Sequence, residues 1–375
     1  MHLDRLLPWF HLKSVPGIGN LLMKRLIDRF QSPEAVLQAD PRDLSRTTGI
    51  PHRLAENIKR HRLPGPVEAE LGRLQQTGIE VVTYTDASYP RLLREIADPP
   101  PFLYVSGRLE TNSANVAIVG ARNATGYGID TSFELSADLA QLGVTVVSGM
   151  ALGIDTAAHE GALQGGGRTV AVLGSGLQRV YPAANRKLFH RISGSGAAIT
   201  EFALNAKPEA HHFPLRNRII SGMSLGVVVV EASTRSGSLI TARLANEQNR
   251  EVFAVPGSIQ SFKSTGTHAL IKSGAKLVEN ARDVIEELMP RLEAVPGEAA
   301  TEKRIDPDRR APLTDQEASV LERLEVYPIH IDALQERLAM PGPQLSSTLL
   351  TLELKGLVRQ LPGKFFACCS EAPDG

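Results

Sequence analysis

The stretch VAIVGARNATGYG (Val116–Gly128) decides the fold, because an apolar run followed by a glycine turn is typical of a strand–turn–helix unit. A dinucleotide-binding turn of the G-x-G-x-x-G type would have its second glycine at position 122. This chain has Arg122 there. An arginine fills the space through which a cofactor pyrophosphate approaches the backbone, and it adds a positive charge. The turn therefore predicts an anion site of another kind.

Apolar runs and helical patterns alternate from Val116 to about Leu288. The runs expected to form strands are Val116–Val119, Val144–Ser148, Thr169–Leu173, Ala197–Thr200, Val227–Val230 and Val252–Val255. Such continuous apolar runs are typical of strands buried on both faces of a parallel sheet. We therefore expect a doubly wound parallel α/β domain. Two strand-like segments, Ile79–Tyr84 and Phe102–Gly107, precede it, and RLPGPVEAE (Arg62–Glu70) is expected to be a linker or loop.

Residues 1–63 are expected to form a small helical domain. VPGIGNLLMKRLIDRF (Val15–Phe30) joins a glycine turn to an amphipathic helix, and Leu44–Arg62 repeats this pattern less well. Both segments resemble halves of helix-hairpin-helix modules, whose turns present backbone N–H groups to a phosphate. Glycines that only make tight turns would explain the pattern equally well. Contact between this domain and DNA is therefore left open.

The C-terminal part is expected to be a winged helix. Residues 289–311 are rich in proline, alanine and charge, which predicts a flexible linker between an α/β domain (64–288) and a last domain (312–369). In the last domain, three amphipathic helices are expected at 313–325, 330–339 and 341–357, followed by a short hairpin at Val358–Ala367.

The charge of this last domain argues against a major role in DNA binding. Its third helix, at about Gln344–Lys355, has no arginine, and residues 312–375 carry five Lys/Arg against nine Asp/Glu. A winged helix that reads duplex DNA places its third helix in the major groove. We therefore expect a protein contact or a spacer role, with weak DNA contact at most.

The composition is ordinary for a soluble globular protein of two or three domains, with 42% hydrophobic and 22% charged residues. The sequence shows no leading signal segment and no apolar run long enough to cross a bilayer, so a cytoplasmic location is expected. Cys368 and Cys369 are adjacent, and no Cys/His cluster has zinc spacing, so no structural metal is expected. The net charge is zero, but residues 1–62 carry eleven Lys/Arg against six Asp/Glu.

The loops that follow the expected strands combine glycine or serine with basic residues. In an open parallel sheet, ligands bind outside the carboxyl ends of the strands. One such loop alone is more often a simple turn or a surface ion pair, but several at one sheet edge predict an anion site made of helix N-termini, N–H groups and arginines. The candidate residues are Gly120, Arg122, Thr125, Ser148, Gly149, Gly174, Arg186, Lys187, Phe213, Arg216, Asn217, Arg218, Ser236, Gly237 and Ser238.

The segment FPLRNRIISG (Phe213–Gly222) is the most informative of these. On a helix, Arg216 and Arg218 would lie about 200° apart, so one is expected to face a phosphate cleft and the other an acidic partner or a neighbouring phosphate. The sequence leaves open which of them faces the cleft. Phe213 could stack on a base, although simple packing of a phenylalanine beside a proline is more common.

Evidence for catalysis in the sequence is weak. Asp155, Glu201 and Glu231 lie near strand ends, but Asp155 could cap a helix and Glu231 could pair with an arginine. His211-His212 is interpreted as having no carboxylate or cysteine at metal or triad spacing, and no G-x-x-x-x-G-K-[ST] loop is present. We therefore expect no catalytic residue, no cofactor and no metal.

The order of motifs resembles one known family. IVGAR…YG, SGMALGIDTAAH, YPAANRKL, FPLRNRIISGMS and EASTRSGSLITA followed by VFAVPG are similar to the DNA-processing protein A family (DprA, also called Smf), over roughly Ile79–Val278. The resemblance implies an extended Rossmann-like domain that binds single-stranded DNA in natural transformation. It implies a homodimer that protects incoming DNA and helps to load RecA recombinase, with no turnover and no cofactor.

The resemblance also assigns site residues. The family's phosphate-contacting arginine falls on Arg122, its R-N-R motif on Arg216-Asn217-Arg218, and its S-G-S turn on Ser236-Gly237-Ser238. This chain departs from the family pattern at Ala121, where serine is frequent, and at His268, where asparagine is frequent. Ala183 and Ala184 occupy the place of a frequent basic residue, so Arg186 or Lys187 would have to supply that charge.

Two other functions fit the pattern less well. A phosphoribohydrolase-like enzyme on a related fold would carry a P-G-G-x-G-T-x-x-E motif, which is absent. A transcription regulator with a ligand-sensing α/β domain would prefer a defined duplex. A row of arginines and N–H groups along a sheet edge suits the successive phosphates of a single strand, with strong salt dependence and little sequence preference.

Overall fold

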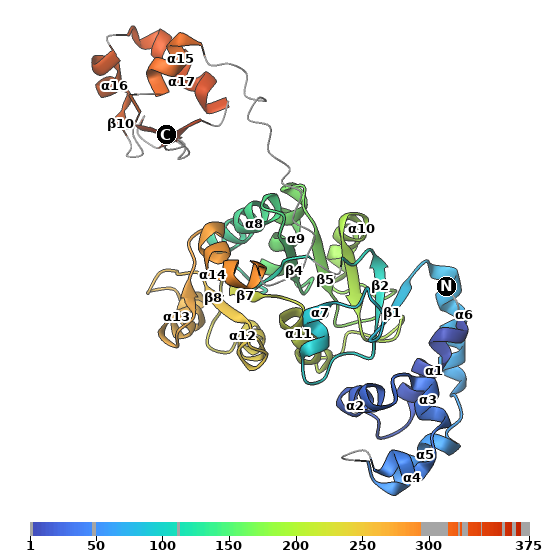
Figure 1. The fold of residues 1–375 in the computed structure, drawn as a ribbon. Coiled ribbons are helices and arrows are strands. Elements are labelled where there is room, and N and C mark those ends of the chain that lie inside the picture. The colour runs from blue at the N-terminus through green and yellow to red at the C-terminus, as the bar shows by residue number, and fades with distance from the viewer. Residues whose placement is uncertain are drawn as a thin grey trace. The chain divides into compact units, whose positions relative to one another are not determined.

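The computed structural model describes residues 3–46, 50–110, 113–293, 314–321, 323–324, 329–338, 340–354, 357–361 and 365–368. The chain forms two compact units, residues 1–296 and 297–375, and each is described by itself (Figure 1). No helix in these ranges is both long and apolar enough to cross a membrane.

The first unit is built on a nine-stranded sheet with the order β1-β2-β6-β5-β4-β3-β7-β8-β9. Its strands are β1 (Glu80–Thr83), β2 (Phe102–Gly107), β3 (Asn115–Val119), β4 (Thr145–Ser148), β5 (Thr169–Val172), β6 (Ala197–Thr200), β7 (Gly226–Val229), β8 (Glu251–Ala254) and β9 (Lys276–Leu277). Strands β3 to β9 run parallel, which confirms the doubly wound sheet. Every predicted strand is present, within a residue or two at its ends. The short strand β9 was not predicted, because two exposed residues are too few to show the apolar pattern of a strand.

The chain order of the sheet reverses at β3, which pairs with β4 on one side and with β7 on the other. Strands β4, β5 and β6 extend the sheet in one direction, and β7, β8 and β9 extend it in the other. A crevice opens at such a switch point, outside the carboxyl ends of the strands. The fold therefore places a binding region beside the loop that contains Arg122.

Helices connect and cover the strands (Figure 1). They are α7 (Arg91–Glu95), α8 (Gly126–Gln141), α9 (Ile154–Gln164), η1 (Ala183–Asn185), α10 (Arg186–Ser195), α11 (His212–Gly222), α12 (Ser238–Glu247), η2 (Phe262–Ser264), α13 (Thr265–Lys272) and α14 (Ala281–Glu293). Helix α14 continues past residue 289, where the linker is predicted to begin. Buried Val284 and Leu288 lie four residues apart on one face of α14, and their packing anchors the helix on the core. The other predicted domain boundaries stay predictions.

Helices α8 and α9 approach each other closely through glycines. A Cβ atom on Gly161 would lie 2.1 Å from the carbonyl oxygen of Phe133, and one on Gly165 would lie 2.5 Å from that of Ala137. Both glycines are one turn apart on α9, and both carbonyls are one turn apart on α8. Larger side chains at positions 161 and 165 would push the two helices apart.

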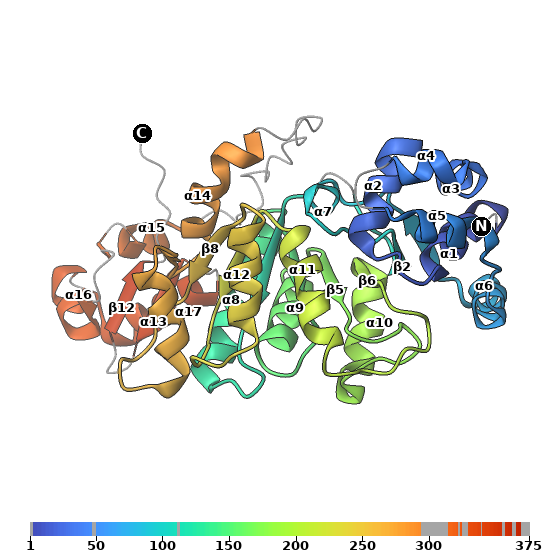
Figure 2. The same ribbon diagram turned by 90° about the horizontal axis from the view of Figure 1, so that it is seen from below.

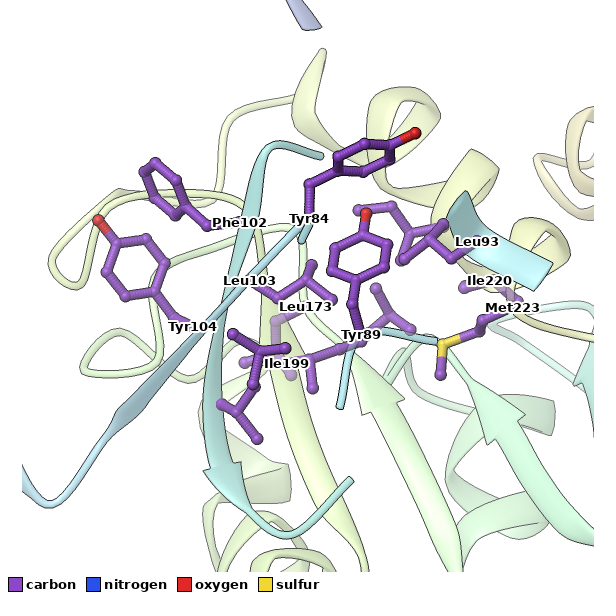
Figure 3. Close-up of a cluster of buried hydrophobic side chains, with 14 of the residues drawn as sticks. Tyr84, Tyr89, Leu93, Phe102, Leu103, Tyr104, Leu173, Ile199, Ile220 and Met223 are labelled. Carbon is purple, nitrogen blue, oxygen red and sulfur yellow. The ribbon is translucent and has the colours of Figure 1, made fainter. Parts of the chain in front are cut away.

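The other edge of the sheet is antiparallel and carries the N-terminal helices. β1 pairs antiparallel with β2, and β2 pairs antiparallel with β6. In the part of the core next to β1 and β2, Tyr84 and Tyr89 pack edge to face (Figure 3). Phe10 of the first helix stacks on Phe102 of β2, with ring centroids 4.4 Å apart. The N-terminal helices are therefore part of the same hydrophobic core as the sheet.

These N-terminal helices are α1 (Leu3–Ser14), α2 (Asn20–Phe30), α3 (Pro33–Gln38), α4 (Pro41–Ser45), α5 (His52–Arg60) and α6 (Gly65–Thr77). The small helical domain is thus present. The predicted linker at Arg62–Glu70 is wrong from Gly65 onward, where α6 begins. Pro66 occupies the first turn of α6, where a missing N–H costs no helical hydrogen bond. The proline therefore starts a helix here and does not break one.

The second unit has helices α15 (Asp315–Leu321), α16 (Ile331–Leu338) and α17 (Gly342–Leu354). Its three-stranded sheet has the order β10-β12-β11, formed by Ile329–His330, Phe365–Cys368 and Val358–Leu361. Its own core includes Leu334, Leu345 and Leu349. The predicted three helices and hairpin of a winged helix are confirmed, with β10 as an additional strand. Most of the predicted linker and Cys369 lie outside the described residues.

Candidate nucleic-acid interface

A cleft of about 620 Å³ lies at the carboxyl end of the sheet, beside the switch point at β3. Its walls come from the loops after β3 and β4, the first turns of α11, the start of α12 and the turn η2. Helices α11 and α12 pack side by side (Figure 2). The sequence predicted a site at this edge, and the predicted residues that line the cleft are Gly120, Arg122, Phe213, Arg216, Asn217, Ser236, Gly237 and Ser238.

Arg122 is exposed at the mouth of the cleft. The central carbon of its guanidinium lies 5.0 Å from the ring centroid of Phe213, which is a cation–π contact. Arg122 forms no salt bridge in the part of the chain that the structure describes, although its charge helps to lower the pKa of Asp155. A cation above an aromatic ring, with its N–H groups unpaired by acid, can bind a phosphate while the ring contacts a base.

Arg216 lies at the bottom of the same cleft, with only 4% of its surface exposed. Its Nη1 donates to the carbonyl oxygen of Val172 at 2.5 Å, and its Nε has no partner among the described residues. Burial lowers the pKa of Arg216 to about 10, an effect that the nearby Asp155 carboxylate opposes. The guanidinium thus remains charged at neutral pH, with donor capacity left in the cleft.

Gly149 makes room for this arginine. A Cβ atom at position 149 would lie 2.0 Å from Nη1 of Arg216. Asp155 lies in the first turn of α9, where burial raises its pKa and the charge of Arg216 lowers it. Asp155 accepts a hydrogen bond from the N–H of Ala151, so it braces the loop after β4 and does not cap α9 as predicted. Gly149 therefore positions Arg216 and does not itself line the cleft.

Arg218 does not line the cleft, and its prediction as a DNA contact is corrected. Its Nη1 and Nη2 donate to the two carboxylate oxygens of Glu201 at 2.7 and 2.8 Å, and its Nε donates to Asp98 at 2.9 Å. Burial alone would lower the pKa of Arg218, but Glu201 beside it raises the pKa. The choice that the sequence left open is thereby resolved: Arg216 faces the cleft and Arg218 has the acidic partners.

Glu201 also binds the N-terminal helices. The side-chain amide of Asn20 donates to its carboxylate at 3.1 Å, and the ammonium of Lys13 donates to its backbone carbonyl at 3.4 Å. Burial lowers the pKa of Lys13, while Glu201 raises it. Glu201 is thus a structural partner of Arg218 and of helices α1 and α2, and has no free carboxylate for catalysis.

Two hydroxyl groups predicted to bind DNA are occupied within the protein. Ser148 is fully buried and donates to the carbonyl oxygen of Ile118 at 2.6 Å. Thr125 caps α8, and both its hydroxyl and its N–H donate to Glu231. Thr125 and Ser148 are therefore corrected, because neither lines the cleft. The predicted pairing of Glu231 with an arginine is wrong, since its carboxylate holds Thr125.

Three further predicted residues lie outside the cleft. Gly174 lies against the ring of Phe213, so a Cβ atom there would be 3.0 Å from it. Arg186 and Lys187 are exposed in the first turn of α10. The structure therefore does not place these two cations beside Arg122 and Arg216. Among the departures from the family pattern, His268 contacts the carbonyl oxygen of Gly257 at 3.0 Å.

The cleft also contains residues that were not predicted, among them Asn123, Phe262 and Lys263. Phe262 and Lys263 come from the loop after β8, the sixth of the predicted strands. That loop lies at the same sheet edge as the others, so its position in the strand order could have identified them. With Lys263, the cleft has three basic side chains, from Arg122, Arg216 and Lys263, against the single carboxylate of Asp155.

The interpretation of His211-His212 also needs correction. One ligand atom from each of Glu209, His211 and His212 lies within 4.8 Å of the others, a spacing that could hold a metal ion. Glu209 is only two residues before His211, and its carboxylate lies 3.5 Å from Nδ1 of that histidine. A loop that turns into a helix brings this carboxylate back to the histidines, which a simple spacing rule does not anticipate.

Comparison with known proteins gives a consistent result over the whole chain. Residues 80–289 match the family model of DNA recombination-mediator protein A, residues 305–364 match a DprA winged helix domain, and residues 11–61 match a SAM-like helix-hairpin-helix tandem. Protein Smf from Synechocystis is 36% identical over 390 residues, which cover 95% of this chain and 96% of that protein. DNA processing protein DprA from Streptococcus pneumoniae is 45% identical over 203 residues, which cover 54% of this chain and 72% of the relative.

Solved structures agree with these matches. The X-ray structure of DNA processing protein A from Streptococcus pneumoniae superposes with a TM-score of 0.65 and 34% identity, covering 76% of this chain and 98% of that one. A structure from Helicobacter pylori has a TM-score of 0.50 and 30% identity, covering 56% of this chain and 97% of that one. The latter was described for its unique single-stranded DNA binding mode.

Proposed function

Because this chain belongs to the DNA recombination-mediator protein A family, we propose that it binds single-stranded DNA in the cleft at the carboxyl end of its sheet. The observation that carries the proposal is the arrangement of Arg122 above Phe213 with Arg216 beneath. The cleft thus contains two cations that can bind phosphates and a ring that can stack on a base. The Helicobacter pylori relative, whose structure concerns single-stranded DNA binding, supports the choice of ligand.

The remaining groups of the cleft suit a sugar–phosphate backbone. The hydroxyls of Ser236 and Ser238 lie 2.8 Å apart at the start of α12, where the N–H groups of a helix can bind an anion. Such contacts do not read a base sequence. We therefore expect binding with little sequence preference.

The broader role rests on the family. We propose that the chain acts in the cytoplasm, protects incoming DNA and helps to load RecA recombinase onto it during natural transformation. In this role it forms a homodimer through its central domain and catalyses no reaction. The paired carboxylates of Glu201 and Glu231 support this view, because both are engaged in structural contacts.

The test compares a single strand with the matching duplex in a fluorescence anisotropy titration. Wild type should bind the single strand more tightly, and Arg122→Ala should lose roughly 1–3 kcal/mol of binding free energy, as charged hydrogen bonds do. Arg243→Ala is the matched control, since Arg243 is an exposed arginine of α12 that pairs with Glu247. Equal losses in both variants, or a preference for the duplex, would contradict the proposal.

Salt dependence gives a second measurement. The logarithm of the association constant should fall linearly with the logarithm of salt concentration, by about 0.7 per phosphate contact on a single strand. Arg122→Ala should reduce the magnitude of that slope by about 0.7, which corresponds to the loss of one phosphate contact. Arg243→Ala should leave the slope unchanged. A flat response of the wild type would exclude phosphate contacts as the source of affinity.

A further inference from the structure

The exposed aromatic side chains of the described residues all lie at one edge of the sheet. They are Tyr127 (55% exposed), Tyr181 (47%) and Phe262 (69%). Tyr127 is in the first turn of α8, which follows β3, while Tyr181 is in the loop after β5 and Phe262 in the loop after β8. All three strands are parallel, so these three rings share the carboxyl edge with the cleft.

One ring lines the cleft, a second contacts a residue of the cleft wall, and the third lines a neighbouring hollow. Phe262 lines the cleft directly. The ring of Tyr181 lies 5.9 Å from that of Phe213, another residue of the cleft wall. Tyr127 lines a neighbouring hollow together with Pro256 and Ser261, which belong to the loop that carries Phe262. The three rings therefore flank the cleft along the sheet edge.

Basic residues alternate with these rings along the chain. Arg122 precedes Tyr127 by five residues, Arg179 precedes Tyr181 by two, and Lys263 directly follows Phe262. Proteins that bind single strands without sequence preference combine cations for the phosphates with aromatic side chains for the bases. The chemistry of this edge thus matches a single strand better than a protein surface, which would favour a continuous apolar patch.

A hydrogen bond holds the ring of Tyr127, and two others fix the backbone turn that carries Phe262. The hydroxyl of Tyr127 donates to the carbonyl oxygen of Pro256 at 3.0 Å. The turn that carries Phe262 is closed by Thr265, whose hydroxyl donates to the carbonyl oxygen of Phe262 at 2.8 Å, and by Ser261, which accepts from the N–H of Lys263 at 3.3 Å. An aromatic ring that stays in water on an anchored backbone loses little freedom when a base stacks on it.

We propose that Tyr127, Tyr181 and Phe262 are base-stacking platforms, with Phe262 in the wall of the cleft and with Tyr127 and Tyr181 extending the single-strand site beyond it. The ligand at each ring is a nucleobase of the strand whose phosphates bind Arg122 and Arg216, so the proposal rests on the proposed function. The rings follow strands between β5 and β8, and these five strands cover about 19 Å at a spacing of about 4.8 Å, which is room for several nucleotides. The site is therefore a track and not a single-nucleotide pocket.

The test measures the affinity of the full-length chain for two probes with equal phosphate charge: an oligothymidine and the same strand with abasic sites. The leucine variants Tyr127→Leu, Tyr181→Leu and Phe262→Leu keep an apolar side chain but remove the π-face. Each variant should reduce the ratio of the affinity for oligothymidine to the affinity for the abasic strand by at least about fivefold. The wild-type ratio contains all three contributions and should therefore be about a hundredfold or more. Affinity for the abasic strand should stay the same in all variants.

Ile259→Ala is the matched control. Ile259 is 91% exposed and lies three residues before Phe262 in the same loop, but it has no π-face. It should leave the ratio unchanged. An equal effect of Ile259→Ala and Phe262→Leu, or a change of oligomeric state in the leucine variants, would overturn the proposal in favour of an apolar protein contact. If wild type binds both probes with equal affinity, the base-stacking proposal is wrong but the proposed function still stands. If wild type binds neither probe, the proposed function itself is wrong.

Discussion

Arg216 and Arg218 are separated by one residue, yet their side chains have different surroundings. Arg216 lies at the bottom of the cleft, where its charge is balanced in part by Asp155. Arg218 is fully paired with Glu201 and Asp98. The angle of about 200° between their positions on α11 makes this division possible.

Replacing Arg216 is therefore expected to affect both DNA binding and stability. Arg216→Ala should weaken single-strand binding and also lower the free energy of unfolding by about 3–5 kcal/mol, because Asp155 would be left as a buried charge without its partner. The measurements are anisotropy and urea denaturation. Adding Asp155→Asn should restore stability but not DNA affinity. Recovery of both would mean that Arg216 acts only through the fold.

His159 predicts how stability depends on pH. It is fully buried on α9, and burial lowers its pKa to about 3. The hydroxyl of Thr169 donates its hydrogen to the carbonyl oxygen of Val146, so Nδ1 of His159 must be the donor in its hydrogen bond with Thr169. In the neutral ring, Nε2 then carries no hydrogen and is an acceptor. It has no hydrogen-bond partner among the described residues. Protonation of the folded state would place a charge at this buried nitrogen.

The unfolded chain takes up this proton near pH 6.5, but the folded chain takes it up only near pH 3. The unfolded state binds more protons between these values, so the free energy of unfolding should fall as the pH falls from 6.5 toward 3. The full effect of His159 is on the order of 5 kcal/mol. Urea denaturation of wild type and of His159→Gln at several pH values checks this. Parallel curves for the two proteins would show that His159 does not contribute.

At the scale of elements, the close contact of α8 and α9 depends on glycine. Gly161→Ala should destabilise the protein by about 1–3 kcal/mol, since the added methyl group would overlap the carbonyl of Phe133. Gly72→Ala is the control, because Gly72 is an exposed glycine inside α6 with no atom near its Cβ position. That change should stabilise α6 by roughly 0.5–1 kcal/mol. Urea denaturation of both variants tests the contrast, and equal effects would refute it.

The sequence predicted the strands well but the contacts between distant segments poorly, because only the strands leave a local sequence pattern. Continuous apolar runs predicted the central strands, because burial on both faces leaves a signal in every residue. Contacts between distant segments leave no such local signal. The hydrogen bonds from Thr125 to Glu231, and from Arg218 to Asp98, join residues more than 100 positions apart, so the sequence could not exclude Thr125 and Arg218 from the cleft. Phe262 and Lys263 were predictable in principle, since they follow a predicted strand.

At the scale of the molecule, the two units have separate cores. The cationic residues of the cleft all belong to the first unit, and residues 312–375 are net acidic. Deletion of residues 312–375 should therefore leave most of the affinity for a single strand intact. An anisotropy titration of the shortened chain measures this, and near-complete loss of affinity would contradict the charge argument.

The contacts of Glu201 bear on how such a protein can change its architecture in evolution. Asn20 and Lys13 complete the surroundings of the Glu201–Arg218 pair, and Phe10 covers Phe102 of the sheet. A lineage that lost the N-terminal helices would have to replace buried polar partners and an aromatic cover at the same time. The C-terminal unit has a core of its own and can be gained or lost by gene fusion and truncation with far fewer compensating substitutions. Loss of the helical N-terminus is therefore expected to need more compensating substitutions than loss of the winged helix.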